Sequence, residues 1–438
     1  MNGGKMSNKY EFIAPCHFGL EAVCKREIAD LGYEIVKVED GKVTFAGDMD
    51  ALVRANIFLR TTQRILLKVA EFKALTFEEL FQNVKKVPWE EYFPSDARFW
   101  VTKATSVKSK LFSPSDIQSI MKKAIVERLK GIYGISWFPE DGPEFPIRVA
   151  FMKDVALIGI DTSGVSLHKR GYRQMTVKAP ITETLASALL MLTPWKKDRI
   201  LVDPFCGSGT FPIEAAMMAA DMAPGMNRHF LAESWEHLIP KECWEDAREE
   251  ARERVNLDIE TDIQGFDIDA AAIKAARANA KMAGVDKLIH FQQRPVSELR
   301  HSKPFGFIVT NPPYGERMLE QRSAQQLYRA FGWEDSLLRD SESMSYVWEP
   351  AEDLWIIAID GNTDSHSGWV DDKTLVWLDE VLTRAKEEGK AVLTFSHQNL
   401  VRHNARFPFG YTFGNAMEIR ELLARHGVSL NLSGHIHL

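Results

Sequence analysis

The feature that most constrains this chain is a glycine-containing turn between a predicted strand and a predicted helix. An apolar run over residues 199–202 leads into the turn, and a helical pattern covers residues 211–220. The turn consists of Asp203, Pro204, Phe205, Cys206, Gly207, Ser208, Gly209 and Thr210. Glycine lets the backbone approach a ligand closely, and N–H groups at a helix start attract negative or electron-rich groups. The turn alone leaves two alternatives open, a ligand site or an ordinary turn, because many α/β turns carry glycines without a ligand.

Two later strand ends favour the ligand site. Residues 265–269 read Gly-Phe-Asp-Ile-Asp and end a second short apolar strand in Asp267 and Asp269. A carboxylate at the carboxyl end of a strand, near a glycine turn, commonly binds a ribose diol. Residues 305–310 form a third predicted strand, which leads into Asn-Pro-Pro-Tyr. We expect the three strand ends to meet at one cleft.

The Asn-Pro-Pro-Tyr segment suits the alignment of an amine. Proline rings fix the backbone and remove N–H donors. The Asn311 side-chain oxygen and the Pro312 carbonyl can therefore accept hydrogen bonds from an exocyclic amine. Tyr314 can stack on the plane of an extruded base. Considered alone, the segment is equally compatible with an ordinary turn.

At the motifs DPFCGSGT, GFDID and NPPYGER the chain resembles the class I S-adenosylmethionine-dependent amino-methyltransferases, and the motifs occur in the same order. The resemblance implies that residues 203–210, Asp267 and Asp269 bind S-adenosylmethionine. It also implies a catalytic segment made of Asn311, Pro312, Pro313 and Tyr314. No metal is needed for this chemistry, because the sulfonium is already activated and catalysis is alignment. The loop after residues 289–291 lacks the acid expected near the adenine, so the adenine contact stays unassigned.

Composition and charge restrict the class of protein. The 438 residues are 45% hydrophobic and 26% charged, which is typical of a globular chain with more than one domain. No apolar run in the sequence is long enough to span a membrane, and the N-terminus is polar. The four cysteines do not form a cluster typical of a metal site. We therefore expect a cytoplasmic protein without a membrane partner. The net charge of −7 argues against a generally basic nucleic-acid binder. Lys and Arg nevertheless outnumber Asp and Glu in residues 1–200, which is compatible with phosphate contact.

The front of the chain predicts a small α+β unit followed by a basic segment. Residues 99–104 form a predicted strand, and Ser113 or Ser115 is expected to cap a helix over residues 116–130. Lysines gather in the strand, the connection and the helix. Judged by charge alone, these lysines are more typical of a solvent-exposed surface than of a surface that contacts RNA.

A second resemblance narrows that choice. SVKSKLFSPSDIQSIMKKAIVERL and DTSGVSLHKRGYR, which leads to APITETLASALL, resemble the THUMP-bearing RNA methyltransferases over about residues 10–317. These bacterial enzymes methylate guanine N2 of large-subunit ribosomal RNA. The resemblance implies ribosomal RNA as the partner, with no obligate protein partner. Residues 182–184 are expected beside the amino-acid end of the cofactor. The role of an insertion at residues 223–253, packing or RNA contact, stays open. The candidate RNA-binding residues are Lys103, Lys108, Lys110, Lys122, Lys123, Lys169, Arg170 and Arg173.

The chain departs from the methyltransferase pattern after Arg317. Strands are predicted at residues 354–360, 391–395 and 430–432, with helices at 374–388 and 416–426 between them. The strand ends carry His397, His435 and His437. A His-x-His pair places two imidazoles on one face of a strand, and imidazole suits Zn, Mn, Fe or Ni. The alternative to a metal site is that these histidines are ordinary surface residues.

FGWEDSLLRDSESMSYVWEP, SHQNL and GVSLNLSGHIH resemble the C-terminal part of a calcineurin-like metallophosphoesterase over about residues 331–438. The resemblance implies a divalent metal. The earlier aspartate and asparagine ligands of that family do not precede residue 331, and two close metals need bridging carboxylates. We therefore expect a remnant with at most three ligands, His397, His435 and His437.

Together these patterns predict an α/β chain with four parts. They are a ferredoxin-like unit at 1–65, a THUMP RNA-binding domain at 66–162, an incomplete Rossmann-like methyltransferase domain at 163–325 and a partial metallophosphoesterase tail at 326–438. The predicted function is S-adenosylmethionine-dependent methylation of guanine N2 in large-subunit ribosomal RNA. A metal-dependent phosphohydrolase and a catalytically inactive THUMP RNA-binding protein are the alternatives. The tail strands could complete the truncated sheet, because both parent folds are layered α/β structures.

Overall fold

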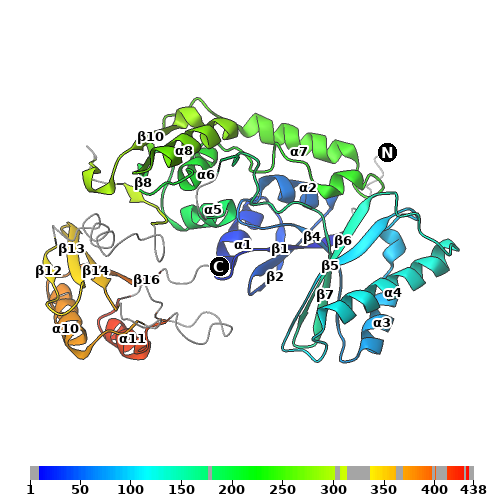
Figure 1. The fold of residues 1–438 in the computed structure, drawn as a ribbon, viewed down its shortest axis with the longest axis horizontal. Helices are drawn as coiled ribbons and strands as arrows, with labels where there is room; N and C mark the ends of the chain where they lie inside the picture. The colour runs from blue at the N-terminus through cyan, green and yellow to red at the C-terminus, as the bar shows by residue number, and fades with distance from the viewer. Residues whose placement is uncertain are drawn as a thin grey trace, which may run out of the picture. The chain divides into compact units, whose positions relative to one another are not determined.

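The computed structural model describes residues 9–175, 180–300, 306–312, 336–361, 368–396, 400, 412–428 and 431–433. The chain divides into two compact units, whose elements Figure 1 labels. The first unit consists of Met1–Pro295 with Arg300–Pro312, and the second of Val296–Leu299 with Pro313–Leu438.

The front of the first unit is a seven-stranded sheet in the order β2-β3-β1-β4-β7-β6-β5. Its strands are β1 (Tyr10–Pro15), β2 (Glu34–Glu39), β3 (Lys42–Gly47), β4 (Leu66–Lys73), β5 (Arg98–Val107), β6 (Glu144–Met152) and β7 (Val155–Asp161). Alternation explains the strands: Phe145, Ile147, Val149 and Phe151 occupy every second position of β6, and all are buried. The sheet is continuous across the predicted boundary at residue 66, because β4 pairs with both β1 and β7.

Four helices pack against this sheet. They are α1 (Glu21–Asp30), α2 (Met49–Phe58), α3 (Phe77–Lys86) and α4 (Pro114–Tyr133). Helices α3 and α4 lie side by side next to β5 (Figure 1). Ser113 is the N-cap of α4, as predicted, but its hydroxyl lies 3.2 Å from the Ser115 hydroxyl and makes no capping hydrogen bond.

The back of the first unit is a parallel sheet in the order β10-β9-β8-β11. Its strands are β8 (Leu201–Asp203), β9 (Ile263–Asp267), β10 (Ile289–Gln293) and β11 (Phe307–Ile308). Helices α5 (Glu183–Leu192), α6 (Thr210–Ala219) and α8 (Ala270–Ala283) share its core. Helix α8 begins where the Asp269 side chain accepts a hydrogen bond from the Ala271 N–H, and it ends at Gly284, whose φ is +76°.

The insertion at residues 223–253 packs against the front sheet. Trp235 is fully buried and stacks on Phe145 of β6, with ring centroids 4.7 Å apart. Helix α7 (Lys241–Arg254) buries Trp244 in the same core. Arg54 of α2 donates two hydrogen bonds to Glu250 of α7, at 2.9 and 2.7 Å. Of the two roles left open for this insertion, the structure shows packing.

The second unit contains its own mixed sheet in the order β12-β13-β14-β15-β16. Its strands are β12 (Leu338–Arg339), β13 (Tyr346–Ala351), β14 (Leu354–Ile359), β15 (Ala391–Ser396) and β16 (Asn431–Ser433). Helices α10 (Asp372–Glu387) and α11 (Ala416–Arg425) pack on it around Trp355 and Leu378. The predicted strands and helices of the tail are therefore present. The expectation that they complete the methyltransferase sheet is wrong, because they form a separate sheet with a separate core.

The described residues also contain 3₁₀ helices at Trp89–Glu91, Leu231–Ser234, Asp286–Leu288 and Val296–Glu298. Among the residues that the structure describes, no helix combines the length and the apolar character that a membrane span requires.

Candidate functional site

Three strand ends converge at one edge of the parallel sheet. Strand β8 lies between β9 and β11, and all three run in the same direction, so their carboxyl ends meet. The Gly207 N–H donates a hydrogen bond of 2.9 Å to Asp267 Oδ2 at the end of β9. On the other side, the Thr310 hydroxyl donates a hydrogen bond of 2.6 Å to Asp203 Oδ1. The glycine turn therefore lies between the acid and the segment that begins at Asn311.

The glycine turn needs its glycines. Gly207 and Gly209 have φ values of +53° and +86° in the left-handed region. A Cβ on Gly209 would lie 3.0 Å from both the Ala276 Cβ and the Phe291 ring, which makes this position tight as well as left-handed. Because Gly209 also precedes α6, the start of that helix has no side-chain cap. Its N–H groups are consequently suited to a polar ligand.

Asp203 is the most strongly perturbed carboxyl group at this edge. It is 1% exposed, and burial raises its pKa to about 7. Hydrogen bonds from the Thr310 hydroxyl and from the Phe205 N–H favour the charged form and oppose that rise. Burial likewise holds the pKa of the Cys206 thiol well above its usual range, so Cys206 stays a protonated thiol that packs in the core.

The two predicted ribose acids have different surroundings. Asp267 bridges backbone groups, since its Oδ2 accepts from the Gly207 N–H and its Oδ1 accepts from the Asp269 N–H at 2.9 Å. Asp269 is exposed and caps α8 through the Ala271 N–H at 2.8 Å. Asp267 is therefore fixed beside the glycine turn, whereas the side chain of Asp269 has a structural role at the helix start.

Three buried hydroxyl groups near the starts of α5 and α6 have no hydrogen-bond partner among the described residues: Thr182 Oγ1, Thr184 Oγ1 and Ser208 Oγ. Arg173 joins the two helix starts, because it donates to the Ile181 carbonyl at 2.8 Å and to Thr210 Oγ1 at 2.9 Å. Leaving a buried hydroxyl unpaired costs about 1–3 kcal/mol. Unpaired hydroxyls beside a turn that admits close backbone approach fit the polar end of a small ligand such as S-adenosylmethionine.

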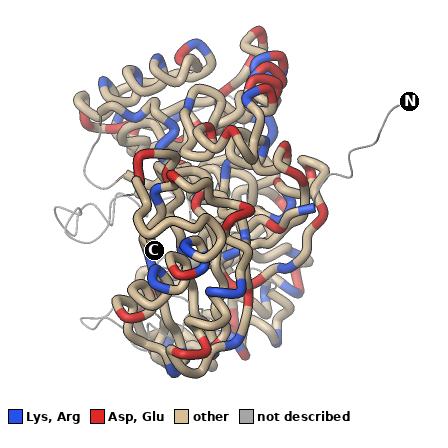
Figure 2. The backbone as a smooth tube through the Cα atoms, turned by 90° about the vertical axis from the view of Figure 1, so that its right-hand side faces the viewer, with Lys and Arg blue, Asp and Glu red and all other residues tan. Residues whose placement is uncertain are grey.

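The predicted RNA contacts divide into two groups. Lys103, Lys108, Lys110, Lys123 and Lys169 are exposed. Lys122 is engaged within the fold, donating to the Phe99 carbonyl at 2.5 Å and to Glu140 at 2.9 Å. On the side of the molecule that Figure 2 shows, basic and acidic residues are interspersed along the tube, so charge does not single out one basic face there.

Arg170 and Arg173 have structural positions instead of surface ones. The Arg170 side chain is 2% exposed and lies 3.5 Å from Glu214, so the structure does not support it as an RNA contact. Tyr172 and Ser187 donate to the same carboxylate at 3.0 and 2.5 Å. The side chain of Arg173 is 13% exposed and pairs with Glu183 at 3.1 Å. Glu214, which accepts all of these contacts, was not predicted from the sequence, because a single acid inside an apolar helical pattern looks like a surface residue.

The remaining predicted site residues lie outside the described part of the chain. These are Pro313, Tyr314, His397, His435 and His437. Within the described residues, no group of three or more His, Cys, Asp or Glu side chains has a geometry that could hold a metal ion. The metal site and the metallophosphoesterase tail therefore stay predictions.

Comparisons with known proteins identify the parts of the chain. Residues 11–66 match the RlmL ferredoxin-like domain, residues 74–161 match the THUMP domain and residues 170–353 match the RMKL-like methyltransferase domain. The last match continues past Arg317, where the sequence resemblance ended, and includes β12 and β13 of the second unit.

Several known proteins are similar to this chain over about three quarters of its length. The chain is 48% identical to the putative RNA methyltransferase YpsC of Bacillus subtilis, over 74% of this chain and 84% of that protein. It is 34% identical to the ribosomal RNA large subunit methyltransferase K/L of Desulfotalea psychrophila, over 74% of this chain but only 46% of that longer protein. The crystal structure of SMU.472, a putative methyltransferase complexed with SAH, superposes with a TM-score of 0.70 at 41% identity, covering 75% of this chain and 86% of that one. The chain belongs to the S-adenosylmethionine-dependent RNA methyltransferases of the RMKL-like family that carry a THUMP domain.

Proposed function

We propose that this protein transfers a methyl group from S-adenosylmethionine to the exocyclic N2 of a guanine in large-subunit ribosomal RNA. The observation that carries the proposal is the pair of hydrogen bonds from Gly207 to Asp267 and from Thr310 to Asp203, which bring the glycine turn beside Asn311. The Desulfotalea relative is named as a ribosomal RNA large subunit methyltransferase, which supports ribosomal RNA as the substrate class.

The glycine turn and its neighbours hold the donor in this proposal. The turn at residues 203–210 and the hydroxyls of Thr182, Thr184 and Ser208 surround its amino-acid end, and Asp267 binds its ribose. When bound, S-adenosylmethionine supplies an activated methyl group. Asp269 is the weaker candidate contact, because its carboxylate already caps α8.

Asn311 and Pro312 orient the acceptor in this proposal. Both are half-buried and follow the strand end that Asp203 fixes through Thr310. The amide oxygen of Asn311 and the carbonyl of Pro312 accept hydrogen bonds from the exocyclic amine, so its nitrogen lone pair points toward the methyl group. As the N–C bond forms, the bond from the methyl group to sulfur breaks, S-adenosylhomocysteine leaves and the amine releases one proton to solvent. The residues named here contribute alignment of the two reactants. Pro313 stiffens the segment and Tyr314 stacks on the flipped guanine, as proposed roles for residues outside the described part of the chain.

We also propose the division of labour between the domains. The ferredoxin-like unit at 1–65 and the THUMP domain at 66–162 bind structured RNA through the exposed THUMP lysines Lys103, Lys108, Lys110 and Lys123. The exposed Lys169, just after the THUMP domain, extends this contact. The methyltransferase domain begins at residue 163. The matches to the RlmL ferredoxin-like and THUMP models support this division.

The direct test is Asn311→Ala. We expect methylation of ribosomal RNA that lacks its native methyl groups to fall by about 10²-fold or more, because a single misaligned group can cost that much. Donor binding by calorimetry should stay close to that of the unchanged protein, since Asn311 faces the acceptor in this proposal. The modified nucleoside, identified by mass spectrometry, distinguishes guanine N2 from adenine N6.

The outcomes separate the alternatives. If Asn311→Ala methylates within a few-fold of the unchanged protein, the role of Asn311 is wrong. If the unchanged chain binds RNA but shows no donor binding, the inactive RNA-binding alternative holds instead.

A further inference from the structure

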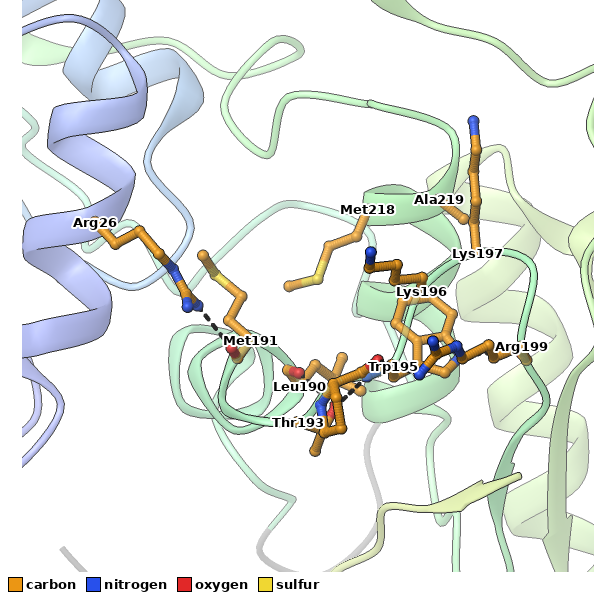
Figure 3. A pocket seen from close by; sticks show the side chains of 11 residues that line it. Arg26, Leu190, Met191, Thr193, Trp195, Lys196, Lys197, Arg199, Met218 and Ala219 are labelled. Atoms are coloured by element: carbon orange, nitrogen blue, oxygen red, sulfur yellow. Dashed lines mark hydrogen bonds between the residues drawn. The ribbon is translucent and has the colours of Figure 1, made fainter. Parts of the chain in front are cut away.

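A hollow of about 600 Å³ lies at the opposite edge of the parallel sheet from the candidate methyl-transfer site (Figure 3). Its floor is the segment that precedes β8, from Thr193 to Arg199, together with the last turns of α5 and α6. Arg26 of α1 closes one side, and its guanidinium donates a hydrogen bond of 2.6 Å to the Met191 carbonyl. The hollow therefore joins the ferredoxin-like helix α1 to the methyltransferase helices within the first unit.

Four cationic side chains line this hollow without a carboxylate partner among the described residues: Arg26, Lys196, Lys197 and Arg199. The two arginines donate to backbone carbonyls, Arg26 to Met191 and Arg199 to Pro194 at 3.1 Å. Lys196 and Lys197 are exposed. Elsewhere in the first unit, basic side chains such as Arg54 and Lys68 pair with acids at 2.7 Å. Cationic side chains without an acidic partner attract anions, so this arrangement favours an anionic ligand.

Trp195 gives the hollow an aromatic wall. Its indole N–H donates a hydrogen bond of 2.9 Å to the Arg199 carbonyl, and its backbone N–H donates to Thr193 Oγ1 at 3.3 Å. Figure 3 shows the indole between Lys196 and Arg199. Proteins that bind single-stranded nucleic acids combine aromatic rings with cationic side chains, because the bases stack on the rings while the phosphates contact the charges. The fixed indole of Trp195 among cations is such a combination.

We propose that this hollow binds the sugar-phosphate backbone of the RNA substrate, with an unpaired base stacked on Trp195. The site is separate from the THUMP lysines and from the methyl-transfer edge. The identity of the bound RNA, ribosomal RNA, rests on the proposed function. The hollow binds RNA and not a single small anion, because four cations spread over α1 and the segment before β8 exceed what one phosphate neutralises.

The test is the salt dependence of RNA binding by the full chain. Fluorescence anisotropy measures binding of a labelled single-stranded RNA of about 20 nucleotides and of a large-subunit ribosomal RNA fragment, at roughly 50 to 200 mM salt. The variant is Lys196→Ala/Lys197→Ala/Arg199→Ala. We expect affinity to fall about tenfold or more and the slope of log affinity against log salt to decrease by about 2, since each single-strand phosphate contact contributes about 0.7.

Matched variants separate this effect from general loss of charge or of structure. Lys281→Ala/Lys287→Ala/Lys386→Ala removes three exposed lysines elsewhere and should leave affinity and slope within twofold of the unchanged protein. Lys196→Glu/Lys197→Glu keeps the hydrogen bond of Arg199 and should weaken RNA binding further. Photo-crosslinking of thiouridine-labelled RNA, mapped by mass spectrometry, should mark the peptide that contains Trp195.

An unchanged affinity and slope in both charge variants would overturn the inference, even if methylation proceeds. Binding to phosphatidylglycerol vesicles that is lost in the variants, with RNA binding unchanged, would overturn it in favour of a membrane surface. If the unchanged protein methylates no ribosomal RNA but the variants still lose RNA affinity, the proposed function fails while the RNA site stands.

Discussion

At the scale of single residues, Asp203 connects the two halves of the candidate site. Its buried carboxyl accepts hydrogen bonds from the turn that precedes α6 and from Thr310 of the acceptor segment. The sequence placed Asp203 in the donor turn but could not show its contact with Thr310, because these residues are 107 positions apart. A contact between residues so far apart in the sequence depends on the order of the strands in the sheet, which local sequence patterns do not determine.

The raised pKa of Asp203 predicts a specific pH dependence of stability. A carboxyl whose pKa is about 7 in the folded state and about 3.9 in the unfolded state binds its proton more tightly when folded. Its contribution to the free energy of unfolding is fully present below about pH 4 and is lost as the pH rises to about 7, by at most about 4 kcal/mol. We expect Asp203→Asn to remove this part of the pH dependence.

Urea unfolding at several pH values between about 4 and 8, followed by tryptophan fluorescence, measures the effect. Asp198→Asn, at an exposed acid near the start of the same strand, is the control and should keep the pH dependence of the unchanged protein. A decline of stability toward pH 7 that persists in Asp203→Asn would assign it to other groups.

Residue type alone misled the sequence analysis in one place. Arg170 lies between Lys169 and Arg173 in a segment that resembles an RNA-binding linker, yet its guanidinium donates to the Leu167 and Arg60 carbonyls and lies beside Glu214. Three neighbouring cations look alike in a sequence. Burial separates them, because the positions of helices α5 and α6 decide that Arg170 meets Glu214 and Arg173 meets Glu183, whereas Lys169 is exposed.

At the scale of elements, the buried network around Glu214 ties the linker after β7 to helix α6. Glu214 is fully buried and is contacted by Arg170, Tyr172 and Ser187. Removal of one partner from a buried charge pair leaves the other charge uncompensated. We expect Glu214→Ala to lower the free energy of unfolding by about 3–5 kcal/mol.

Glu144→Ala is the matched control. Glu144 pairs with Arg98 at 2.9 Å, but the two side chains are 41% and 56% exposed, so the loss should be about 1 kcal/mol or less. Equal losses in the two variants, measured by urea unfolding, would contradict the proposed importance of the buried network.

The positions of helices and strands along the chain were more predictable than the pairing of the strands. The sequence located β14, β15, β16 and the two helices of the second unit, because alternation and helical periodicity are local properties of segments such as Leu354–Ile359 and Asp372–Glu387. It did not predict β12 or β13. It did not show that these strands form their own sheet. Strand β4, which begins at the predicted boundary between residues 1–65 and 66–162, pairs with a strand from each of these two parts. Pairing between distant strands is set by packing of the whole sheet, not by the pattern of one strand.

At the scale of the whole molecule, a segment of the methyltransferase sequence completes the core of the RNA-binding front. Trp235 lies between β8 and β9 in the sequence, yet it is 0% exposed in the core of the front sheet. Its indole N–H donates a hydrogen bond of 2.9 Å to the Glu144 carbonyl of β6, and its ring stacks on Phe145. The stability of the front sheet therefore depends on residues far outside the ferredoxin-like and THUMP matches.

This arrangement predicts where a substitution at Trp235 acts. We expect Trp235→Ala to lower the free energy of unfolding by about 3–5 kcal/mol, because it removes a large buried ring and leaves a cavity. Hydrogen exchange should accelerate in β5 and β6 of the front sheet more than in β8, β9 and β10. Trp137→Ala, at an 81% exposed tryptophan, is the control and should change stability by about 0.5 kcal/mol or less. If exchange in Trp235→Ala accelerates only in the parallel sheet, the insertion does not couple the two sheets. If it accelerates in the front sheet, a substitution outside the RNA-binding domains should also weaken RNA binding.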